Sequence, residues 1–288
     1  MRTLRLQSPR MTGADVAAWQ HFLAAQGFYT STIDGDFGPL TAQATKAYQT
    51  KKGLTADGIV GLATYARAVH DGYQPPAGQV AIPGMDASSN CQTFLRCIAQ
   101  DGMKFVVRYY AASQNVSKII TPQEAAALSA AGLQIAVVYE DGANVQDFNA
   151  ATGRKHASRA LSLAAGIGQP ANSAIYFAAD FNATAADARG PLVDYFGAVM
   201  QVLATAATRY AVGIYSDGAA CRIIRDSGLA AFTWLSNSTS YRESNAFRPQ
   251  ADIVQIAPER NICNGLLNID DDIAQSENFG AFRLVLPT

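Results

Sequence analysis

The sequence predicts an α/β protein in which a small helical domain precedes a (β/α)8 barrel of the TIM type. In the second region, short β-branched and aromatic runs alternate eight times with Ala-rich helical stretches. Some of these runs, such as QIAVVY and AIYFAA, are continuously apolar, as expected for parallel strands covered on both faces. Eight such units over roughly 210 residues fit a closed barrel, and a doubly wound open sheet is the alternative.

A short segment separates the two regions. Residues 70–79, HDGYQPPAGQ, hold two adjacent prolines and two glycines, a composition that is typical of linkers. The region before this segment is helical in pattern and rich in Ala and Gln. We therefore predict a helical domain over residues 1–72, a linker over residues 73–79 and a barrel over residues 80–288.

The first domain is predicted to be a bundle of three helices. Val16, Trp19 and Leu23 recur at helical spacing in the first of them. Two turns, IDGDFG and ADGIVG, form a short internal repeat and precede the second and third helices. Each turn places a glycine, Gly35 or Gly58, where the backbone is expected to need a positive φ.

The motif residues of this domain resemble those of the peptidoglycan-binding domain of cell-wall hydrolases. The resemblance spans about residues 12–68 and departs from the family pattern at Tyr48, where phenylalanine is usual. It implies a domain that anchors the chain to bacterial peptidoglycan, while the motif residues themselves are expected to build turns and core. These residues are Asp34, Gly35, Phe37, Gly38, Pro39, Thr41, Tyr48, Gln49, Gly53, Leu54, Asp57, Gly58, Val60, Gly61 and Thr64.

The second domain is predicted to alternate strands and helices along its whole length. Residues 121–124, Thr-Pro-Gln-Glu, open one helix as a capping box with proline in the first turn. The predicted strands span residues 80–86, 104–110, 133–140, 174–180, 210–216, 232–237, 252–256 and 266–270. The clearest helical patterns span residues 121–131, 153–166, 189–208 and 219–228.

Composition excludes several classes of protein. The formal net charge of the 288-residue chain is -1, which argues against a nucleic-acid partner because phosphate contacts need a surplus of Lys and Arg. We expect no membrane insertion, since no apolar stretch is long enough to cross a bilayer. The N-terminus lacks the apolar core and cleavage site of a signal peptide. We expect a monomer.

Neither a metal nor a cofactor is predicted. The four cysteines contain no C-x-x-C pair, and the chain has no Walker loop and no H-E-x-x-H motif. Free or buried thiols are the expected state of the cysteines, and one disulfide is the alternative. The three histidines are scattered, so neither a Ser-His-Asp site nor a Cys-His site is supported.

Acidic residues end four of the predicted strands. Asp86, Glu140, Asp180 and Asp270 close the first, third, fourth and eighth strand, and in such a barrel these ends meet at the active-site face. Cleavage of a glycosidic bond needs one protonated acid and one ionised carboxylate, and crowded carboxylates raise one another's pKa. The sequence therefore predicts a carboxylate site for glycosidic cleavage.

Individual acids also have structural explanations. A strand-end aspartate such as Asp86 or Asp180 often caps the next helix or tightens a turn. Glu140 is favoured as a functional residue because glutamate is a poor helix cap and a poor strand residue.

Further side chains near the strand ends are candidates for binding a sugar. Aromatic rings offer flat faces to pyranose rings, and polar side chains can bond to hydroxyl groups. The candidates are Tyr109, Tyr139, Tyr215, Trp234, Gln255 and Asn182, and Asp270 would orient the substrate or a neighbouring acid.

The second domain resembles a glycoside-hydrolase-like domain related to family 25 lysozymes. The resemblance covers most of residues 80–280, and the Ile-Tyr-Phe-Ala-x-Asp run of residues 175–180 is its most specific part. Other matching segments are Gly84-Met85-Asp86, Val107-x-Tyr109, Thr121-Pro122-x-Glu124, Ala130-x-Gly132-Leu133, Gly168-Gln169-Pro170, Val212-Gly213-Ile214-Tyr215 and Gln255-Ile256. Family 25 lysozymes are β-1,4-N-acetylmuramidases with acids at the ends of the first, fourth and last strands of a modified barrel.

One position departs from the family 25 pattern. These enzymes carry Asp-x-Glu at the fourth strand, and that glutamate is the proton donor. Residues 180–182 of this chain are Asp-Phe-Asn, and the amide of Asn182 cannot donate a proton as a carboxyl group does. Either Glu140 takes over the acid role or the barrel has lost hydrolysis.

The sequence thus predicts a peptidoglycan-degrading glycoside hydrolase of the muramidase type. Glu140 would be the general acid, and Asp86 and Asp180 would stabilise the developing cation or position water. The alternative is a protein that binds peptidoglycan without cutting it. An amidase or peptidase is not supported, because the sequence shows no set of zinc ligands and no nucleophile–base pair. We expect action in the periplasm or cell wall, reached through a phage holin as an endolysin or through a secretion machine as an antibacterial effector.

Overall fold

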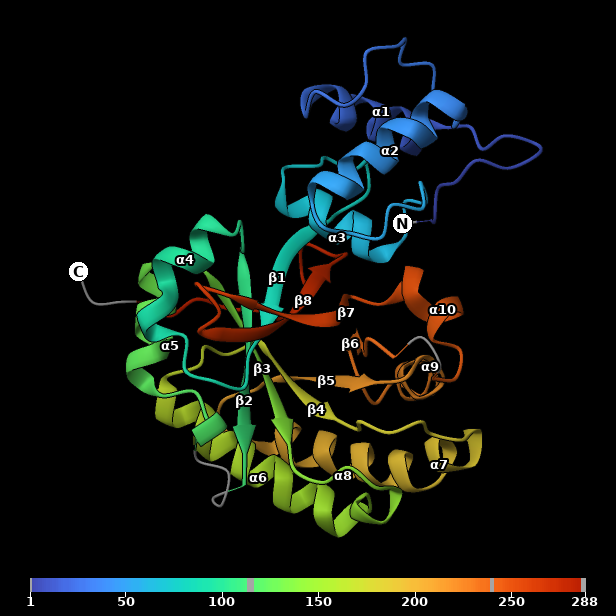
Figure 1. Cartoon of the computed structure of the whole chain (residues 1–288). Helices are drawn as coiled ribbons and strands as arrows, with labels where there is room; N and C mark the ends of the chain where they lie inside the picture. The colour runs from blue at the N-terminus through green and yellow to red at the C-terminus, as the bar shows by residue number, and fades with distance from the viewer. Residues whose placement is uncertain (1, 113–116, 239–240, 286–288) are drawn as a thin grey trace. The chain divides into compact units, whose positions relative to one another are not determined.

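The structure, a computed structural model, describes residues 2–112, 117–238 and 241–285. The chain divides into two compact units, residues 1–83 and residues 84–288. The first unit is helical and the second contains the sheet (Figure 1). The domain bounds and the linker at residues 73–79 stay predictions.

Three helices build the N-terminal unit, as predicted. They are α1 (Ala14–Ala25), α2 (Pro39–Lys51) and α3 (Leu62–His70). Trp19 of α1 is fully buried, and its indole N–H donates a hydrogen bond to Thr45 Oγ1 at 2.9 Å. The polar atom of this large core side chain is therefore satisfied. Its ring contacts those of Phe22, Tyr48, Tyr65 and Tyr73.

The first of the two repeated turns is held by a glutamine of the preceding helix. The buried side chain of Gln20 accepts hydrogen bonds from the backbone N–H groups of Asp34 and Gly35, at 3.1 and 2.8 Å. It donates to Asp34 Oδ1 at 2.7 Å and to the carbonyl of Asp36 at 3.1 Å. Gly35 has a φ of 68°, in the left-handed region that glycine favours.

Gln49 of α2 repeats this arrangement at the second turn. It accepts a hydrogen bond from the Gly58 N–H at 2.8 Å. It donates to Asp57 Oδ1 and to the carbonyl of Ile59, both at 2.9 Å. Gly58 has a φ of 77°, so both predicted positive φ values are confirmed. A buried amide that binds an Asp-Gly turn is the physical content of the internal repeat.

Eight strands close into a barrel, which confirms the predicted fold class (Figure 1). From β1 to β7, each strand pairs in parallel with the next one along the chain. The strands are β1 (Ile82–Asp86), β2 (Phe105–Ala111), β3 (Gln134–Glu140), β4 (Ala174–Ala178), β5 (Ala211–Ser216), β6 (Phe232–Leu235), β7 (Ile253–Ile262) and β8 (Leu267–Ala274).

The last strand departs from a regular (β/α)8 barrel. β8 runs antiparallel to β7, because residues 263–266 alone connect the two strands, whereas a parallel crossover needs a dozen or more residues. The acids at residues 270–272 therefore lie inside a strand and not after its end. In the β7–β8 register, Ile256 pairs with Asp271 and Gln255 with Asp272.

Helices pack against the outside of the barrel, with α5, α6, α8 and α9 in contact with its strands. The predicted helix over residues 189–208 corresponds to α8, which begins after Gly190 and ends at Thr205. The helices are α4 (Leu95–Gln100), α5 (Pro122–Ala130), α6 (Ala150–Ile167), α7 (Ala185–Arg189), α8 (Pro191–Thr205), α9 (Gly218–Asp226) and α10 (Ser244–Phe247), with short 3-10 turns η1 (Gln92–Phe94), η3 (Val145–Asp147) and η4 (Arg248–Gln250). Within the described ranges, no helix has the length and apolar character needed to cross a bilayer.

The predicted capping box at α5 is half formed. Thr121 Oγ1 accepts the Glu124 N–H at 3.1 Å, but the Glu124 carboxylate turns inward and accepts a hydrogen bond from Arg108 Nε at 2.7 Å. Both side chains of this ion pair are fully buried. Arg108 also donates to the carbonyls of Ala87 and Lys118. The ion pair neutralises two buried charges and holds the segment after β1 and the segment before α5 against β2.

Replacement of Gln20 by leucine should destabilise the N-terminal unit by roughly 2–3 kcal/mol, because two backbone N–H groups lose their acceptor. Denaturant unfolding monitored by hydrogen exchange at the α1 amides measures this. Gln43→Leu, at an exposed position of α2, is the matched control and should change the stability by less than about 0.5 kcal/mol. Equal unfolding of Gln20→Leu and wild type would contradict the role of the buried amide.

Candidate active site

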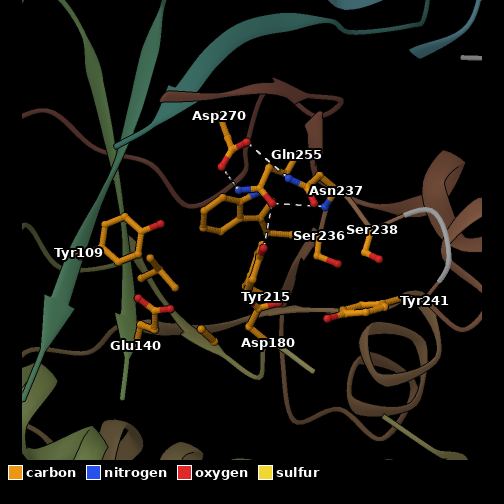
Figure 2. A pocket seen from close by; sticks show the side chains of 13 residues that line it. Tyr109, Glu140, Asp180, Tyr215, Ser236, Asn237, Ser238, Tyr241, Gln255 and Asp270 are labelled. Carbon is orange, nitrogen blue, oxygen red and sulfur yellow. Dashed lines mark hydrogen bonds between the residues drawn. The ribbon is translucent and has the colours of Figure 1, made fainter. Parts of the chain in front are cut away.

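A pocket of about 270 Å³ opens at the mouth of the barrel where the parallel strands end (Figure 2). Glu140 and Ala178 are the last residues of β3 and β4, and Tyr109 and Tyr215 lie near the ends of β2 and β5. The chain that follows β6, from Ser236 on, lines the pocket as well. This is the face on which the loops of (β/α)8 enzymes carry their catalytic residues.

Three carboxylates line the pocket: Glu140, Asp180 and Asp270. Asp180 follows β4 by two residues, and Asp270 lies within β8. Figure 2 shows Glu140 and Asp180 on one side of the pocket and Asp270 on the other. The pKa of Asp180 is raised because surrounding protein displaces water from its carboxyl and because the charge of Glu140 is close.

Glu140 binds a lysine at the edge of the pocket. Lys118 Nζ lies 2.6 Å from Glu140 Oε2. The same ammonium lies 5.2 Å from the centroid of the Tyr109 ring, within the range of a cation–π contact. The side chains of Lys118 and Glu140 are 38% and 30% exposed, so the ion pair is partly in water.

Asp86 lies beneath the pocket and not in its wall. It is 4% exposed. It accepts hydrogen bonds from the Tyr109 hydroxyl at 2.8 Å and from Gln255 Nε2 at 2.7 Å. Burial, followed by the charge of Asp270, raises the pKa of Asp86 well above the usual range of a carboxyl group.

The amide of Gln255 joins the acids to the pocket wall. Its Nε2 also donates to Asp270 Oδ2 at 3.3 Å. Its Oε1 accepts hydrogen bonds from the Tyr215 hydroxyl at 2.8 Å and from the Asn237 N–H at 3.2 Å. Donors and acceptors around this amide are therefore satisfied in one orientation.

Asp272 is a second buried acid beneath the pocket. It is fully buried, and its Oδ1 accepts the Trp234 Nε1–H at 2.9 Å, while Oδ2 has no hydrogen-bond partner among the described residues. Burial, followed by the charge of Asp86, raises the pKa of Asp272 well above its ordinary value. The buried charge of Asp86 therefore favours the protonated form of Asp272.

The described residues of the barrel unit, taken alone, contain no group of three His, Cys, Asp or Glu side chains close enough to hold a metal ion. The acids of the pocket instead meet N–H and O–H donors from Gln255, Trp234 and Tyr109. This arrangement suits proton transfer and charge stabilisation by carboxyl groups.

Seven of the ten sequence-predicted site residues line this pocket, and three do not. Asp86, predicted to be catalytic, is buried and bonded to lining residues instead. Tyr139 precedes Glu140 in β3, so its side chain points to the opposite face of the strand and packs against His156 and Phe177. Asn182 accepts the backbone N–H of Arg242 at 3.2 Å and is not part of the lining. The residues that do line the pocket are Glu140, Asp180, Asp270, Tyr109, Tyr215, Trp234 and Gln255.

Sequence reasoning missed Lys118 and the chain after β6. Ser236, Asn237 and Tyr241 line the pocket. The predicted strand over residues 232–237 ran two residues past the end of β6 at Leu235, and the polar run that begins at Ser236 could have indicated these residues. Lys118 lies before α5 and not directly after a strand, so its proximity to Glu140 leaves no comparable signal in the sequence.

A disulfide bond corrects the expectation that all the cysteines are thiols. Cys97 of α4 is bonded to Cys263 in the turn after β7, and Cys91 and Cys221 are buried thiols. The two bonded positions are 166 residues apart in the sequence, so their proximity exists only in the folded barrel.

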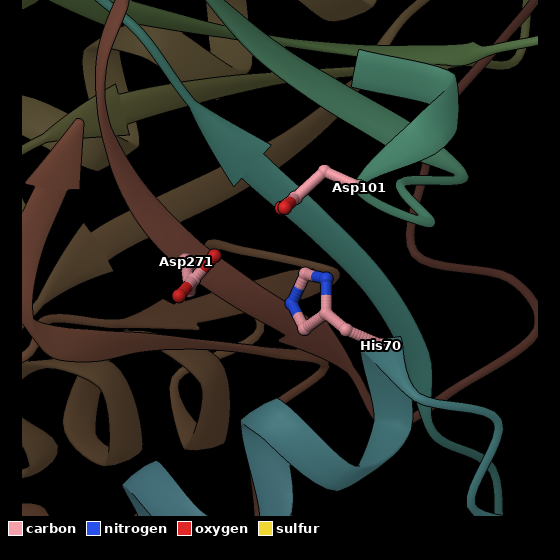
Figure 3. A group of neighbouring side chains, drawn as sticks. All are labelled: His70, Asp101 and Asp271. Carbon is pink, nitrogen blue, oxygen red and sulfur yellow. The ribbon is translucent and has the colours of Figure 1, made fainter. Parts of the chain in front are cut away.

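An arginine reinforces this connection between α4 and the last two strands. Arg260 of β7 donates hydrogen bonds to Asp271 of β8, both at 2.8 Å, and to Asp101, which follows α4. Figure 3 shows Asp101 at the end of α4 and Asp271 on β8. Asp271 lies between Asp270 and Asp272, so this ion pair holds the strand that carries both acids.

A closed barrel with carboxylates around a pocket at the strand ends is an architecture of glycoside hydrolases. Residues 96–274 match the family described as Rv2525c-like, glycoside hydrolase-like domain. The chain belongs to this family. Residues 12–67 match the putative peptidoglycan binding domain, which places a peptidoglycan-binding domain in the N-terminal unit.

Similar proteins come from several bacteria. The uncharacterized protein FadG of Bacillus subtilis is 24% identical over 261 residues, 88% of this chain and 45% of FadG. The N-acetylmuramoyl-L-alanine amidase CwlL of Bacillus licheniformis is 44% identical over 69 residues, 22% of this chain and 19% of CwlL. The chain thus spans less than half the length of these curated relatives. The crystal structure of the Mycobacterium tuberculosis Tat-secreted protein Rv2525c has the same fold, with a TM-score of 0.58 and 22% identity over 70% of this chain and 98% of that one.

Reduction of the Cys97–Cys263 bond should lower the stability of the barrel unit by about 2–5 kcal/mol, the usual contribution of a native disulfide. Calorimetry with and without reductant measures this. The double variant Cys97→Ser/Cys263→Ser is the control, and reductant should not change its unfolding. Thiol titration of the denatured wild type should find two thiols before reduction and four after it, and four thiols before reduction would contradict the bond.

Asp272→Asn should stabilise the barrel unit near neutral pH by at least about 1 kcal/mol and have little effect near pH 4. The raised pKa of Asp272 means that the unfolded chain ionises first, so wild type loses stability as pH rises above the ordinary aspartate range. Urea unfolding at both pH values measures the difference. Asp226→Asn, at an exposed position, is the control, and an equal gain at both pH values would contradict the role of charge.

Proposed function

We propose that this protein binds bacterial peptidoglycan through its N-terminal unit and hydrolyses the glycan strand in the barrel pocket, as an N-acetylmuramidase. The observation that carries the proposal is the pair of carboxylates, Glu140 and Asp180, that line one pocket at the mouth of the barrel, with the charge of Glu140 close enough to raise the pKa of Asp180. Glycosidic hydrolysis needs such a pair, one to protonate the leaving oxygen and one to stabilise or attack the cationic centre or to activate water.

The pocket also offers contacts for a sugar ring. Tyr109, Tyr215 and Tyr241 line it and are neither fully buried nor fully exposed, so part of each ring can contact a pyranose. Asn237 contributes a polar side chain to the same wall. Trp234 is 1% exposed and packs against Tyr215, which makes it a support for that ring more than a sugar contact.

The acids beneath the pocket support the reaction electrostatically. Asp86 and Asp272 are too deeply buried to meet a glycosidic bond directly. Asp86 is hydrogen-bonded to two pocket residues, Tyr109 and Gln255. The negative charge on the buried acids would stabilise the positive charge that develops at the anomeric carbon.

We propose that the chain acts in the cell wall, outside the cytoplasm. The peptidoglycan-binding domain brings it to its polymer, and the Cys97–Cys263 bond suits an oxidising compartment. Delivery by a phage holin as an endolysin, or export as an antibacterial effector, would both bring the chain to this location.

A wall-binding protein without hydrolysis is the second candidate. Asn182 favours this candidate. It stands where family 25 enzymes have a proton donor, and its side-chain amide instead accepts a hydrogen bond from the backbone N–H of Arg242. In that case the barrel would retain glycan without release of fragments.

Glu140→Gln and Asp180→Asn should each lower the release of soluble glycan fragments at least about a hundredfold, the usual contribution of an acid or base in catalysis. Wild type should release fragments with new reducing-end muramic acid from purified peptidoglycan, as measured by mass spectrometry. Co-sedimentation with peptidoglycan should be unchanged in both variants, because the N-terminal unit is intact.

Glu277→Gln, at an exposed position after β8, is the matched control and should retain wild-type activity. Wild type that sediments with peptidoglycan but releases no fragments would overturn the hydrolase and support the wall-binding candidate. Fragments with new free amino groups at the peptide stem would indicate a different bond.

A further inference from the structure

We propose that Lys118 is a positioning residue that keeps Glu140 as the charged carboxylate of the site and leaves Asp180 as the proton donor. This inference rests on the proposed glycosidase function and deepens it by assigning the roles of Glu140 and Asp180. It reverses the role of general acid that the sequence suggests for Glu140.

The geometry of the ion pair carries the assignment. Lys118 Nζ donates a hydrogen bond to Glu140 Oε2 at 2.6 Å, a short distance, as expected when donor and acceptor are both charged. A carboxyl proton on that oxygen would compete with the ammonium for the same site. A general acid has to present a proton to the glycosidic oxygen. Glu140 instead accepts a hydrogen bond from the Lys118 ammonium.

Lys118 is held in this position by the backbone around it. Its carbonyl accepts a hydrogen bond from Arg108 Nη2 at 3.2 Å, and Arg108 is itself fixed by the buried Glu124. Two residues further on, the Ile120 N–H donates to the Tyr109 carbonyl at 3.0 Å. The segment before α5 is thus connected to β2, and the buried ion pair of Arg108 and Glu124 fixes the backbone of Lys118.

The surrounding charges differ between the two pocket acids. Glu140 faces the carboxyl groups of Asp180 and Asp86 and the hydroxyl of Tyr109, and each of those three groups feels its negative charge. Lys118 compensates this charge at Glu140 alone through a direct contact. Asp180 has a raised pKa, from the displacement of water and from the Glu140 charge, which favours its protonated form.

The reaction then balances with one proton donor and one charged partner. Asp180 transfers its proton to the glycosidic oxygen as the bond from that oxygen to the anomeric carbon breaks, and Glu140 stabilises the positive charge at the carbon. Attack of water on the carbon forms the new C–O bond and returns one proton to the carboxyl pair. The products are two shorter glycans, and the net reaction consumes one water.

The pH dependence of kcat/KM tests this assignment, since its two limbs report the base and the acid of the free enzyme. Lys118→Met should lower the maximal kcat/KM on solubilised glycan at least tenfold. It should also move the acidic limb of the profile to higher pH, because the carboxylate of the site loses an adjacent positive charge. In Lys118→Arg the acidic limb should stay close to its wild-type position, because arginine keeps the positive charge.

Two controls separate this effect from a change in folding. Lys104→Met, at an exposed position just before β2, should leave both limbs unchanged. Circular dichroism should be the same for all variants. A uniform loss of kcat/KM in Lys118→Met without movement of the acidic limb would overturn the assignment, and so would movement of the basic limb alone.

A measurement without catalysis keeps the two proposals distinguishable. The chain contains five glutamates, so NMR of protein labelled at the glutamate 13Cδ can follow each carboxyl group, and the Glu140 signal is the one absent from Glu140→Gln. At neutral pH this signal should move in Lys118→Met, because the carboxylate loses its direct contact with the ammonium, and an unmoved signal would overturn the role of Lys118. If the signal shifts but wild type releases no glycan fragments, the charge assignment stands and the glycosidase function fails.

Discussion

The two hydrogen bonds that the Gln255 amide donates inside the closed barrel are the interaction on which the candidate site depends. Its Nε2 binds Asp86 of β1 and Asp270 of β8, while Tyr215 and Asn237 hold its Oε1. Carboxyl groups without such partners would be costly to bury, by several kcal/mol each. The amide therefore makes an acidic interior compatible with folding, and it joins the first and last strands of the barrel to the wall of the pocket.

The direction of β8 decides which acids enter that interior. Successive residues of a strand face opposite sides, so Asp270 and Asp272 point inward while Asp271 points outward to Arg260. The disulfide at Cys263 holds the same hairpin to α4. An outer contact and a covalent bond thus stabilise a strand whose inner face carries like charges. Lys118 completes this distribution of charge, since its ammonium contacts the carboxylate of Glu140.

The barrel and much of the pocket could be predicted because both follow from local pattern. Continuous apolar runs indicate parallel strands, and acids directly after them reach one rim, which is why Glu140 and Asp180 were found. The reversal of β8 was missed because β7 extends to Ile262, well past the predicted end at residue 256, and leaves too short a connection for a helix. Tyr139 was wrongly predicted to line the pocket, because it lies one residue before Glu140 in β3 and its side chain therefore points to the opposite face of the strand. Lys118 and the disulfide depend on contacts between distant segments, for which the sequence has no periodic signal.

The most direct test of this account is a crystal structure of Glu140→Gln with a soluble peptidoglycan tetrasaccharide of alternating N-acetylglucosamine and N-acetylmuramic acid. The account predicts an intact glycan across the barrel mouth, with a glycosidic oxygen within hydrogen-bond distance of Asp180 and a sugar ring against Tyr215. A pocket that stays empty at saturating glycan, or a glycan bound with no glycosidic bond near Asp180, would contradict it.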